Sequence, residues 1–220
     1  MASNSVSVAD IGTDHAYVPV YLILNGMAKS AIAMDINNGP LMRADENIKR
    51  FSLTDSIKTR LSDGLKELEN NEADTVIIAG MGGVLINSII DNDKERLTSV
   101  KRYILQPMTA IEETRKYLEQ NGFRIVNEKL AKEDNKIYTV ICAEYGKMKI
   151  ENEINYYIGQ CLLDNHDEIL PELLEGKIYE YEKAISSMKN TDNEETIKKA
   201  RHYSYLLGEF KRLKEECATW

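Results

Sequence analysis

No stretch of this sequence has the roughly 18 consecutive apolar residues that a membrane-spanning helix needs. The first residues, MASNSVSVAD, also lack the basic start and the apolar run of a signal peptide. Only three cysteines are present, Cys142, Cys161 and Cys217, and their separations match neither a metal-ligand spacing nor an obvious disulfide framework. These absences predict a cytoplasmic protein that uses no metal and keeps its cysteines reduced and buried or half-buried.

Basic residues are also in short supply. The chain has 28 Lys and Arg against 36 Asp and Glu, which gives a net charge of −8 at pH 7. Because nucleic-acid binding rests on a basic footprint, this balance argues against a generic polyanion binder but leaves room for a local basic patch. The remaining composition, 43% hydrophobic and 29% charged, is that of an ordinary globular protein with a sizeable core.

Short apolar stretches alternate with helical ones over the first 145 or so residues. The expected strands are 6–11, 30–35, 57–62, 74–79, 101–106, 123–130 and 136–145, and the expected helices lie near 16–26, 39–51, 64–70, 83–92 and 109–121. Gly26 and Gly122 stand where helix ends are expected. The alternation predicts an α/β fold with a mostly parallel seven-stranded sheet and helices on both faces. The short polar AKEDN between the last two strands suits an antiparallel hairpin, so one strand near the edge should run in reverse.

From about residue 147 the strand pattern ceases and charged helical stretches are expected at 151–167, 171–189 and 193–217. Apolar residues recur there at steps of three and four, at Leu174, Ile178, Tyr181, Ile185 and Met188, and again at Tyr203, Leu206, Phe210, Leu213 and Cys217. This spacing predicts a C-terminal antiparallel, coiled-coil-like helical hairpin. A plain amphipathic face packed on the rest of the core is the alternative. We therefore expect two domains, 1–146 and 147–220.

Polar residues or glycines follow five of the expected strands. They are Asp10, Gly12, Asp14 and His15 after the first strand, Asp35 after the second, Asp63 and Gly64 after the third, the AGMGG segment 79–83 after the fourth, and Gln106 and Pro107 after the fifth. In open α/β sheets ligands bind at the carboxyl ends of the strands, where the strand order reverses. The pattern therefore predicts a ligand site at one edge of the sheet.

The charges at this edge indicate the kind of ligand. Asp35 ends the second strand, where a carboxylate typically accepts hydrogen bonds from ribose hydroxyls. The first loop, GTDHAY, is not G-x-G-x-x-G, and its acidic side chains would repel a phosphate and attract a cation. S-adenosyl-L-methionine carries a ribose, an adenine, an ammonium and a sulfonium, and no phosphate. The sequence predicts this cofactor, and the missing phosphate loop disfavours a nicotinamide oxidoreductase.

The segments ADIGTDHAYVP, AMDINNGPL, LSDGL, IIAGMGG and ILQP occur in this order along the chain. With them, the chain resembles the bacterial tRNA (adenine-22-N1)-methyltransferase family over about residues 8–146, and the helical tail matches in architecture. The resemblance implies a Rossmann-like methyltransferase domain, a C-terminal coiled-coil-like domain and methyl transfer from S-adenosylmethionine to N1 of an adenine in tRNA. The family normally has a helical segment ahead of the ADIG strand, whereas this chain has nine residues before Asp10, most of them small and polar.

The resemblance also implies roles for matching residues. Asp10, Gly12 and Asp14 would surround the methionine part of the cofactor, and Asp35 and Ile36 would hold its ribose and adenine. Asp63 would accept from the exocyclic amine of that adenine, with Gly64 allowing a close backbone approach. The segment Ala79, Gly80, Met81 and Gly82 would lie at the cofactor and the target base, and Gln106 and Pro107 would border the pocket for that base.

Adenine N1 has a free lone pair at neutral pH, so catalysis needs alignment and acceptor groups near the cation that forms on the base. Asp14, His15 and the segment Gly80, Met81 and Gly82 are the candidates for these tasks. For tRNA binding, Lys198, Lys199 and Arg201 are the candidate phosphate contacts, although acidic neighbours also suit a solvated helix face.

Other functions stay open on the sequence alone. The net charge favours a methyltransferase that acts on a small molecule or a protein, and a non-catalytic ligand-binding module is also compatible with the motifs. A monomer is favoured over an oligomer.

Overall fold

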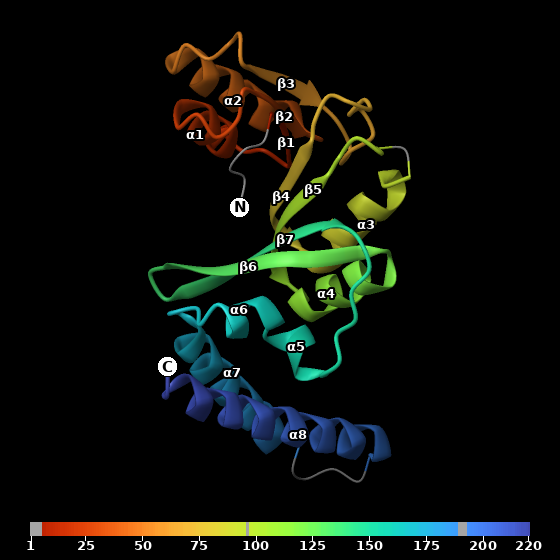
Figure 1. Ribbon diagram of the computed structural model, residues 1–220, viewed down its shortest axis with the longest axis vertical. Helices are drawn as coiled ribbons and strands as arrows, with labels where there is room; N and C mark the ends of the chain where they lie inside the picture. Colours follow the sequence, from red (N-terminus) through yellow and green to blue (C-terminus); the bar gives the residue numbers. More distant parts are fainter. Residues whose placement is uncertain (1–5, 96, 189–192) are drawn as a thin grey trace. The chain divides into compact units, whose positions relative to one another are not determined.

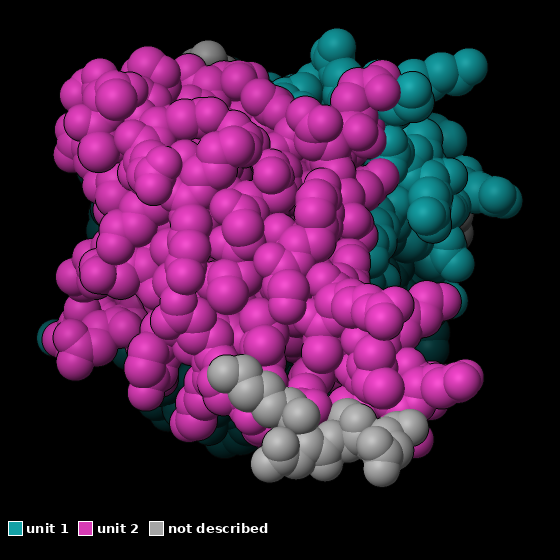
Figure 2. Space-filling view, turned by 90° about the horizontal axis from the view of Figure 1, so that it is seen from below, with its two compact units in different colours: residues 1–128, 139–149 teal, residues 129–138, 150–220 magenta. Residues whose placement is uncertain are grey.

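The computed structural model describes residues 6–95, 97–188 and 193–220 of the chain (Figure 1). The chain divides into two compact units, residues 1–128 with 139–149 and residues 129–138 with 150–220, shown in teal and magenta in Figure 2. Each unit is described by itself below.

A seven-stranded sheet with strand order β3-β2-β1-β4-β5-β7-β6 organises the first unit. The strands are β1 (Ser7–Ile11), β2 (Ser30–Asp35), β3 (Ile57–Leu61), β4 (Thr75–Gly82), β5 (Arg102–Thr109), β6 (Phe123–Glu133) and β7 (Lys136–Tyr145). The first five pair in parallel and β7 runs antiparallel to β5, which confirms the predicted sheet with one reversed strand. The tip of the β6–β7 hairpin, residues 129–138, belongs to the second unit.

The central strands are apolar on both faces because both faces are covered by helices. In β1, Ala9 and Ile11 belong to one buried cluster and Val8 to another, as expected when successive side chains point to opposite faces. Helices α3 (Gly83–Asp93) and α4 (Ile111–Gln120) contribute to the first cluster, and α1 (Tyr17–Leu24) and α2 (Asn38–Arg50) contribute to the second. The predicted helices on both faces are confirmed.

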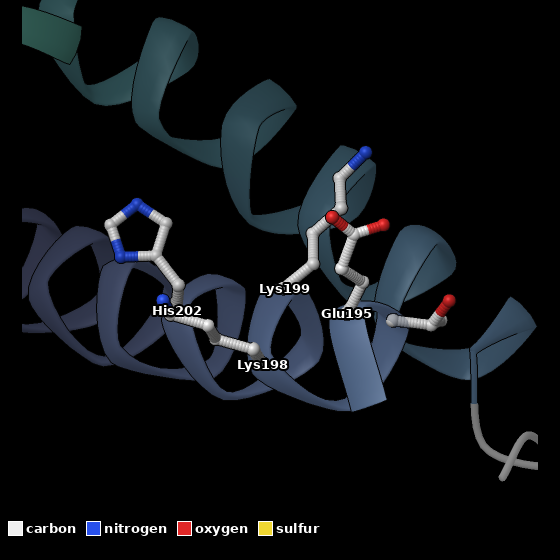
Figure 3. A pocket seen from close by; sticks show the side chains of 5 residues that line it. Glu195, Lys198, Lys199 and His202 are labelled. Carbon is white, nitrogen blue, oxygen red and sulfur yellow. The ribbon is translucent and has the colours of Figure 1, made fainter. Parts of the chain in front are cut away.

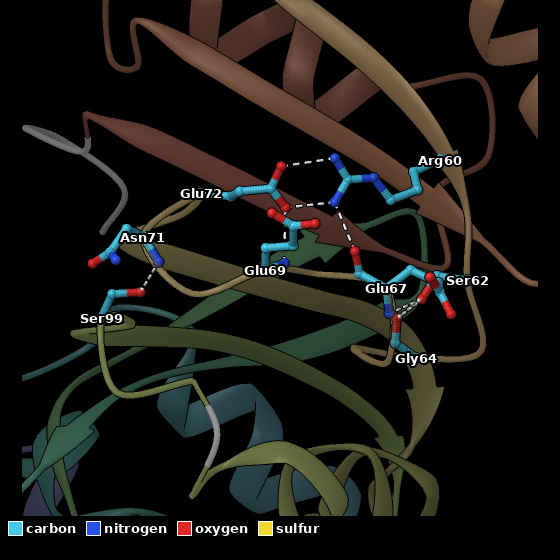
Figure 4. A network of polar contacts seen from close by, with 8 residues as sticks. All are labelled: Arg60, Ser62, Gly64, Glu67, Glu69, Asn71, Glu72 and Ser99. Carbon is cyan, nitrogen blue, oxygen red and sulfur yellow. Dashed lines mark hydrogen bonds and ion pairs between the residues drawn. The ribbon is translucent and has the colours of Figure 1, made fainter.

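The prediction of a helix at 64–70 is wrong: this segment forms turns. Side chains hold it in that conformation, as Figure 4 shows. The Arg60 guanidinium donates to the Glu72 carboxylate and to the Glu67 carbonyl, and the Ser62 hydroxyl donates to the Gly64 carbonyl at 2.8 Å. Side-chain bonds to the backbone compete with helical ones, and here they replace them.

Four helices make up most of the second unit: α5 (Ile154–Tyr157), α6 (Gln160–Asp164), α7 (Leu170–Ser187) and α8 (Glu194–Cys217). The single helix predicted at 151–167 is wrong, because Gly159 adopts a φ of +97° and separates two short helices. The predicted helix 171–189 begins one residue earlier than expected and is seen to Ser187, and its predicted last residue lies outside the described residues.

Helices α7 and α8 run antiparallel and bury one apolar face between them. Ion pairs join Glu182 to Lys211 and Glu175 to Lys214. The residue numbers of the partners decrease along α7 as they increase along α8, as expected for antiparallel helices. The core of this unit contains most of the residues predicted for the seam, including Leu174, Tyr181, Leu206, Phe210, Leu213 and Cys217.

The three cysteines lie as predicted, Cys142 and Cys217 buried and Cys161 half-buried. Within the described residues, we find no helix with the length and apolar character to span a membrane.

Phe210 tests the core between α7 and α8. Its side chain is fully buried and meets the ring of Tyr181 edge-on, with 5.0 Å between centroids. We expect Phe210→Ala to lower the free energy of unfolding by about 3–5 kcal/mol, as for other buried phenylalanines. Urea unfolding followed by circular dichroism measures the change. Tyr205→Ala, on the exposed side of the same helix, is the control and should stay within about 0.5 kcal/mol of the unchanged chain.

Candidate cofactor and active site

The carboxyl ends of the parallel strands meet at one edge of the sheet, and the strand order reverses there between β1 and β4. In register, Asp10 of β1 lies between Ala33 of β2 and Ile77 of β4. Asp35 ends β2, and Ala79 of β4 lies beside Gln106 of β5. The structure thus brings the strand-end residues predicted from the sequence to a single edge.

Asp10 is a buried carboxylate in an apolar sheet, with only 6% of its surface exposed. Burial raises the pKa of Asp10 from 3.8 to about 6, because the charged form is poorly solvated there, and the nearby Thr13 hydroxyl offsets this only in part. The Thr13 hydroxyl is itself buried and makes no hydrogen bond of ordinary geometry to the described residues. An ionised carboxylate buried in this way is costly unless a partner or a bound ligand with positive charge compensates it.

Gly12 turns the chain sharply at the end of β1. Its φ of +74° is in the left-handed region that favours glycine, and the N–H groups of Gly12 and Thr13 both donate to the Met34 carbonyl, at 2.8 and 2.9 Å. A Cβ at Gly12 would come within 2.0 Å of the Met81 methyl group. The first loop is therefore packed directly against the AGMGG segment.

Asp14, His15 and Ala16 form a turn that leads into α1. Asp14 is exposed, and hydrogen bonds from Arg43 of α2 hold the pKa of this carboxyl below its usual value. The His15 ring stacks on Tyr17, with 5.1 Å between centroids. Sequence reasoning missed Arg43, Asn47 and Tyr17 as neighbours of this turn, although the spacing of Arg43 and Asn47 places both on one face of a helix.

Asp35 is half-buried, and one oxygen of its carboxylate accepts from the Asn37 N–H at 2.7 Å. The other oxygen has no partner among the described residues, so it is available to a hydroxyl. Ile36, next in the chain, is 59% exposed and offers an apolar surface beside this carboxylate.

Asp63 and Gly64 lie in the turn after β3, where Ser62 donates to the Gly64 carbonyl and Arg60 donates to the Glu67 carbonyl. The Asp63 carboxylate pairs with Lys66 at 2.5 Å and raises the pKa of that lysine. A ligand amine would therefore compete with Lys66 for Asp63. A Cβ at Gly64 would lie 3.1 Å from Ile89, so the backbone passes close to α3 at this point.

The AGMGG segment forms a bulge on β4 next to β5. The pairing register of the two strands shifts between Ala79, Met81 and Gly82, and the Gly80 N–H donates to Oε1 of Gln106 at 2.8 Å. Bulges of this kind are frequent beside active sites, where they redirect the backbone. Pro107 is buried in β5 opposite Met81.

The basic residues predicted to contact tRNA lie on α8 in the second unit. Lys198 and Lys199 line a surface pocket together with Glu195, Thr196 and His202, as Figure 3 shows. Lys199 lies over the Tyr203 ring at 5.3 Å, and Arg201 is exposed.

A protein-family model described as tRNA (adenine(22)-N(1))-methyltransferase matches residues 8–206 of the chain. The chain belongs to this family. Membership confirms the resemblance seen in the strand-end segments. The mostly parallel seven-stranded sheet followed by C-terminal helices confirms the predicted α/β fold class, and the coiled-coil character of those helices stays a prediction.

Individual members of the tRNA (adenine(22)-N(1))-methyltransferase family show the same relationship. The Bacillus subtilis enzyme of that name is 41% identical over 143 residues, which cover 65% of this chain and 60% of the relative. The crystal structure of the B. subtilis m1A22 tRNA methyltransferase TrmK superimposes with a TM-score of 0.87 at 30% identity, covering 97% and 94% of the two chains. M. capricolum TrmK, in complex with S-adenosyl-homocysteine, superimposes with a TM-score of 0.78 at 29% identity, covering 98% and 92%.

The buried Asp10 gives a stability prediction with a definite sign. Because folding raises the pKa of this group from 3.8 to about 6, its charge destabilises the folded state above pH 6, and this cost falls to nothing as the pH drops below about 4, where the group is protonated in both states. We expect Asp10→Asn to raise the free energy of unfolding at pH 8 by up to about 3 kcal/mol, and the gain to vanish near pH 4. Urea unfolding at pH 4, 6 and 8 measures this dependence.

The control for this prediction is Asp55→Asn, which removes the same charge from an exposed position and should change stability little at any of the three pH values. An Asp10→Asn effect that is the same at pH 4 and pH 8 would contradict the assignment of the cost to the buried charge.

Proposed function

We propose that this chain transfers a methyl group from S-adenosyl-L-methionine to N1 of adenine 22 in tRNA. The observation that carries the proposal is the acidic ligand edge at the β1–β4 reversal, in a chain that belongs to the tRNA (adenine(22)-N(1))-methyltransferase family. A related structure, that of M. capricolum TrmK, holds S-adenosyl-homocysteine, described as its natural cofactor product.

The residues at this edge fit such a cofactor. A buried carboxylate with a raised pKa, Asp10, and the buried Thr13 hydroxyl beside it both favour a ligand with positive charge and hydrogen-bond donors. In our proposal, Asp10, Gly12 and Asp14 hold the methionine part. The unengaged oxygen of Asp35 accepts from the ribose.

Ile36, Asp63 and Gly64, together with Ala79 and Gly80, would hold the adenine part of the cofactor. An S-adenosylmethionine bound here supplies a methyl group that its sulfonium already activates. The chain therefore needs neither a covalent nucleophile nor a metal ion for this reaction.

The remaining task of the protein is to align the adenine and to accept the charge that develops on it. Positioning alone can contribute up to about 7–11 kcal/mol. The Gly80 N–H is engaged by Gln106, so the backbone carbonyls of Gly80, Met81 and Gly82 are the groups of this segment suited to a cationic base. Asp14 and His15, in the first loop, would also stabilise the charge that develops on the target adenine. Gln106 and Pro107 would border the pocket for that base.

The basic residues of α8 form two sets, one with ion-pair partners and one without such partners among the described residues. Lys211, Arg212 and Lys214, toward the C-terminal end, are all in ion pairs with glutamates. Lys198, Lys199 and Arg201, toward the N-terminal end, have no ion-pair partner among the described residues. We propose that the second set contacts tRNA phosphates, because a cation already neutralised by a carboxylate gains less from a phosphate.

This function implies a cytoplasmic site of action, where tRNA is found, and a division of work between a catalytic domain, 1–146, and a helical domain, 147–220. We further propose that the monomer is the active form, since each chain carries both the ligand edge and the second set of cations on α8.

A labelled-methyl assay on unmodified tRNA tests the proposed activity. We expect incorporation into a transcript with adenine at position 22 and none after its replacement by guanine.

Asp35→Asn keeps an acceptor for the Asn37 N–H but replaces the second oxygen with a donor. The Asp35→Asn substitution should raise KM for the cofactor and so lower kcat/KM by at least about tenfold, since a hydrogen bond to a charged group contributes about 1.5–3 kcal/mol. Asp55→Asn is the matched control. Methylation of a metabolite or protein extract in place of tRNA would contradict the proposal.

The proposed phosphate-binding residues have their own test. We expect the triple variant Lys198→Gln, Lys199→Gln and Arg201→Gln to weaken tRNA binding about tenfold. The slope of the logarithm of the tRNA binding constant against the logarithm of the salt concentration should become shallower by about 0.9 for each phosphate that the variant no longer neutralises. Filter binding between about 50 and 200 mM salt measures both effects. The matched control, Lys211→Gln, Arg212→Gln and Lys214→Gln, removes the same net charge and should change the slope little. Equal slopes for the two variants would rule out a specific patch.

A further inference from the structure

The turn from Asp14 to Ala16 holds an unfavourable backbone. His15 and Ala16 have φ angles of +60° and +52°, so two consecutive residues with a Cβ are in the left-handed region. Such residues are costly and persist only where the surrounding structure over-determines them. The side chains that hold this turn therefore decide the shape of the first loop of the site.

Two side chains of α2 hold the turn. Arg43 donates from both Nε and Nη2 to Oδ1 of Asp14, at 3.1 and 2.8 Å. Asn47 donates from Nδ2 to the His15 carbonyl at 2.8 Å. Because Arg43 and Asn47 are four residues apart, they lie on the same face of the helix, and they donate hydrogen bonds to successive residues of the turn.

The geometry at Asp14 leaves half of its carboxylate unused. Both donors of Arg43, and the His15 ring at 3.6 Å, are directed at Oδ1. Among the described residues, Oδ2 has no partner. Arg43 thus orients the carboxylate and keeps it ionised while one oxygen stays available for a positively charged group.

The same helix also begins at the ribose position. The N-cap of α2 is Asn37, whose N–H is bonded to the Asp35 carboxylate. One helix therefore contacts Asp35 at its start and the Asp14–Ala16 turn from its middle.

We propose that Arg43 and Asn47 are positioning residues that hold the Asp14–Ala16 turn in the shape needed for cofactor binding and methyl transfer. This inference rests on the proposed function. Neither residue contacts the reacting groups; Arg43 acts through Asp14, and Asn47 acts through the His15 backbone.

An ordinary surface ion pair is the competing explanation for the Arg43–Asp14 contact. An exposed pair contributes little to stability. A positioning role instead predicts a large effect on the loop and on kinetics with almost none on global unfolding.

The first experiment needs no cofactor. We expect Arg43→Gln and Asn47→Ala to speed amide hydrogen exchange in a peptide that covers residues 13–17 of the ligand-free chain, because the turn then opens more often. Alanine suits a helix interior, so Asn47→Ala leaves α2 intact. The matched control is Arg50→Gln, which removes the same charge from an exposed site on the same helix. Exchange rates equal to those of the control would overturn the proposal.

The second experiment is a double-mutant cycle. Arg43→Gln should lower kcat/KM for the cofactor by about tenfold or more, since a displacement of about 1 Å can cost as much as 10²-fold. In an Asp14→Ala background the same substitution should change kcat/KM less than about twofold, because the oxygen that accepts from Arg43 is then gone. An equal loss in both backgrounds would contradict an effect through Asp14, and so would faster exchange without any kinetic loss.

The two proposals fail in different ways. Absence of methyl transfer to tRNA by the unchanged chain would remove the proposed function. The positioning role is then still tested by exchange at residues 13–17 and by calorimetric binding of S-adenosyl-homocysteine. An affinity for that ligand unchanged by both substitutions would overturn it.

Discussion

The burial of one carboxylate at the centre of an apolar sheet is the constraint on which the site depends. Asp10 lies in register between alanine and isoleucine side chains of the neighbouring strands, where a charge is poorly solvated and its pKa rises to about 6. The fold tolerates this cost because the surrounding apolar residues of β1, β2 and β4 are buried on both faces. The carboxylate lies at the strand reversal, where ligands bind in open α/β sheets, and in our proposal the positive charge of the cofactor offsets the cost there.

Around this carboxylate, polar side chains from other elements hold each loop of the site. Gln106 of β5 binds the Gly80 N–H in the bulge of β4, and the Arg60–Glu72 pair holds the turn that carries Asp63. Arg43 of α2 does the same for Asp14. These contacts are exposed or half-buried and add little to global stability individually. Their physical effect is on the geometry of the loops, which are otherwise only short connections between rigid strands and helices.

The charge distribution on α8 reconciles a net charge of −8 with a polyanionic substrate. A net charge averages over the whole chain, whereas phosphate binding needs only a few unneutralised cations in one place. Ion pairs with α7 and within α8 neutralise the cations toward the C-terminal end, and within the described residues those at Lys198, Lys199 and Arg201 are left. Both sets are basic in the sequence; glutamates one turn away on α8 neutralise Arg212, and the packing of α7 on α8 neutralises Lys211 and Lys214.

The sequence by itself determined the features that depend on local pattern. Apolar runs such as VADI and TVIIA specify buried parallel strands, and the residues that follow each run must meet at one edge, whatever the details of the loops. Tertiary structure alone decided the features that depend on partners distant in the chain. Two departures from the expected elements have local causes instead: residues 64–70 form turns because Arg60 donates to the Glu67 carbonyl and Glu72 accepts from the Glu69 N–H, and Gly159 divides the segment expected to be one helix. Arg43 and Asn47 read as ordinary surface residues of a helix until folding brings them beside Asp14 and His15. Such contacts join elements far apart in the sequence, and no local periodicity encodes which side chain will be there to make them.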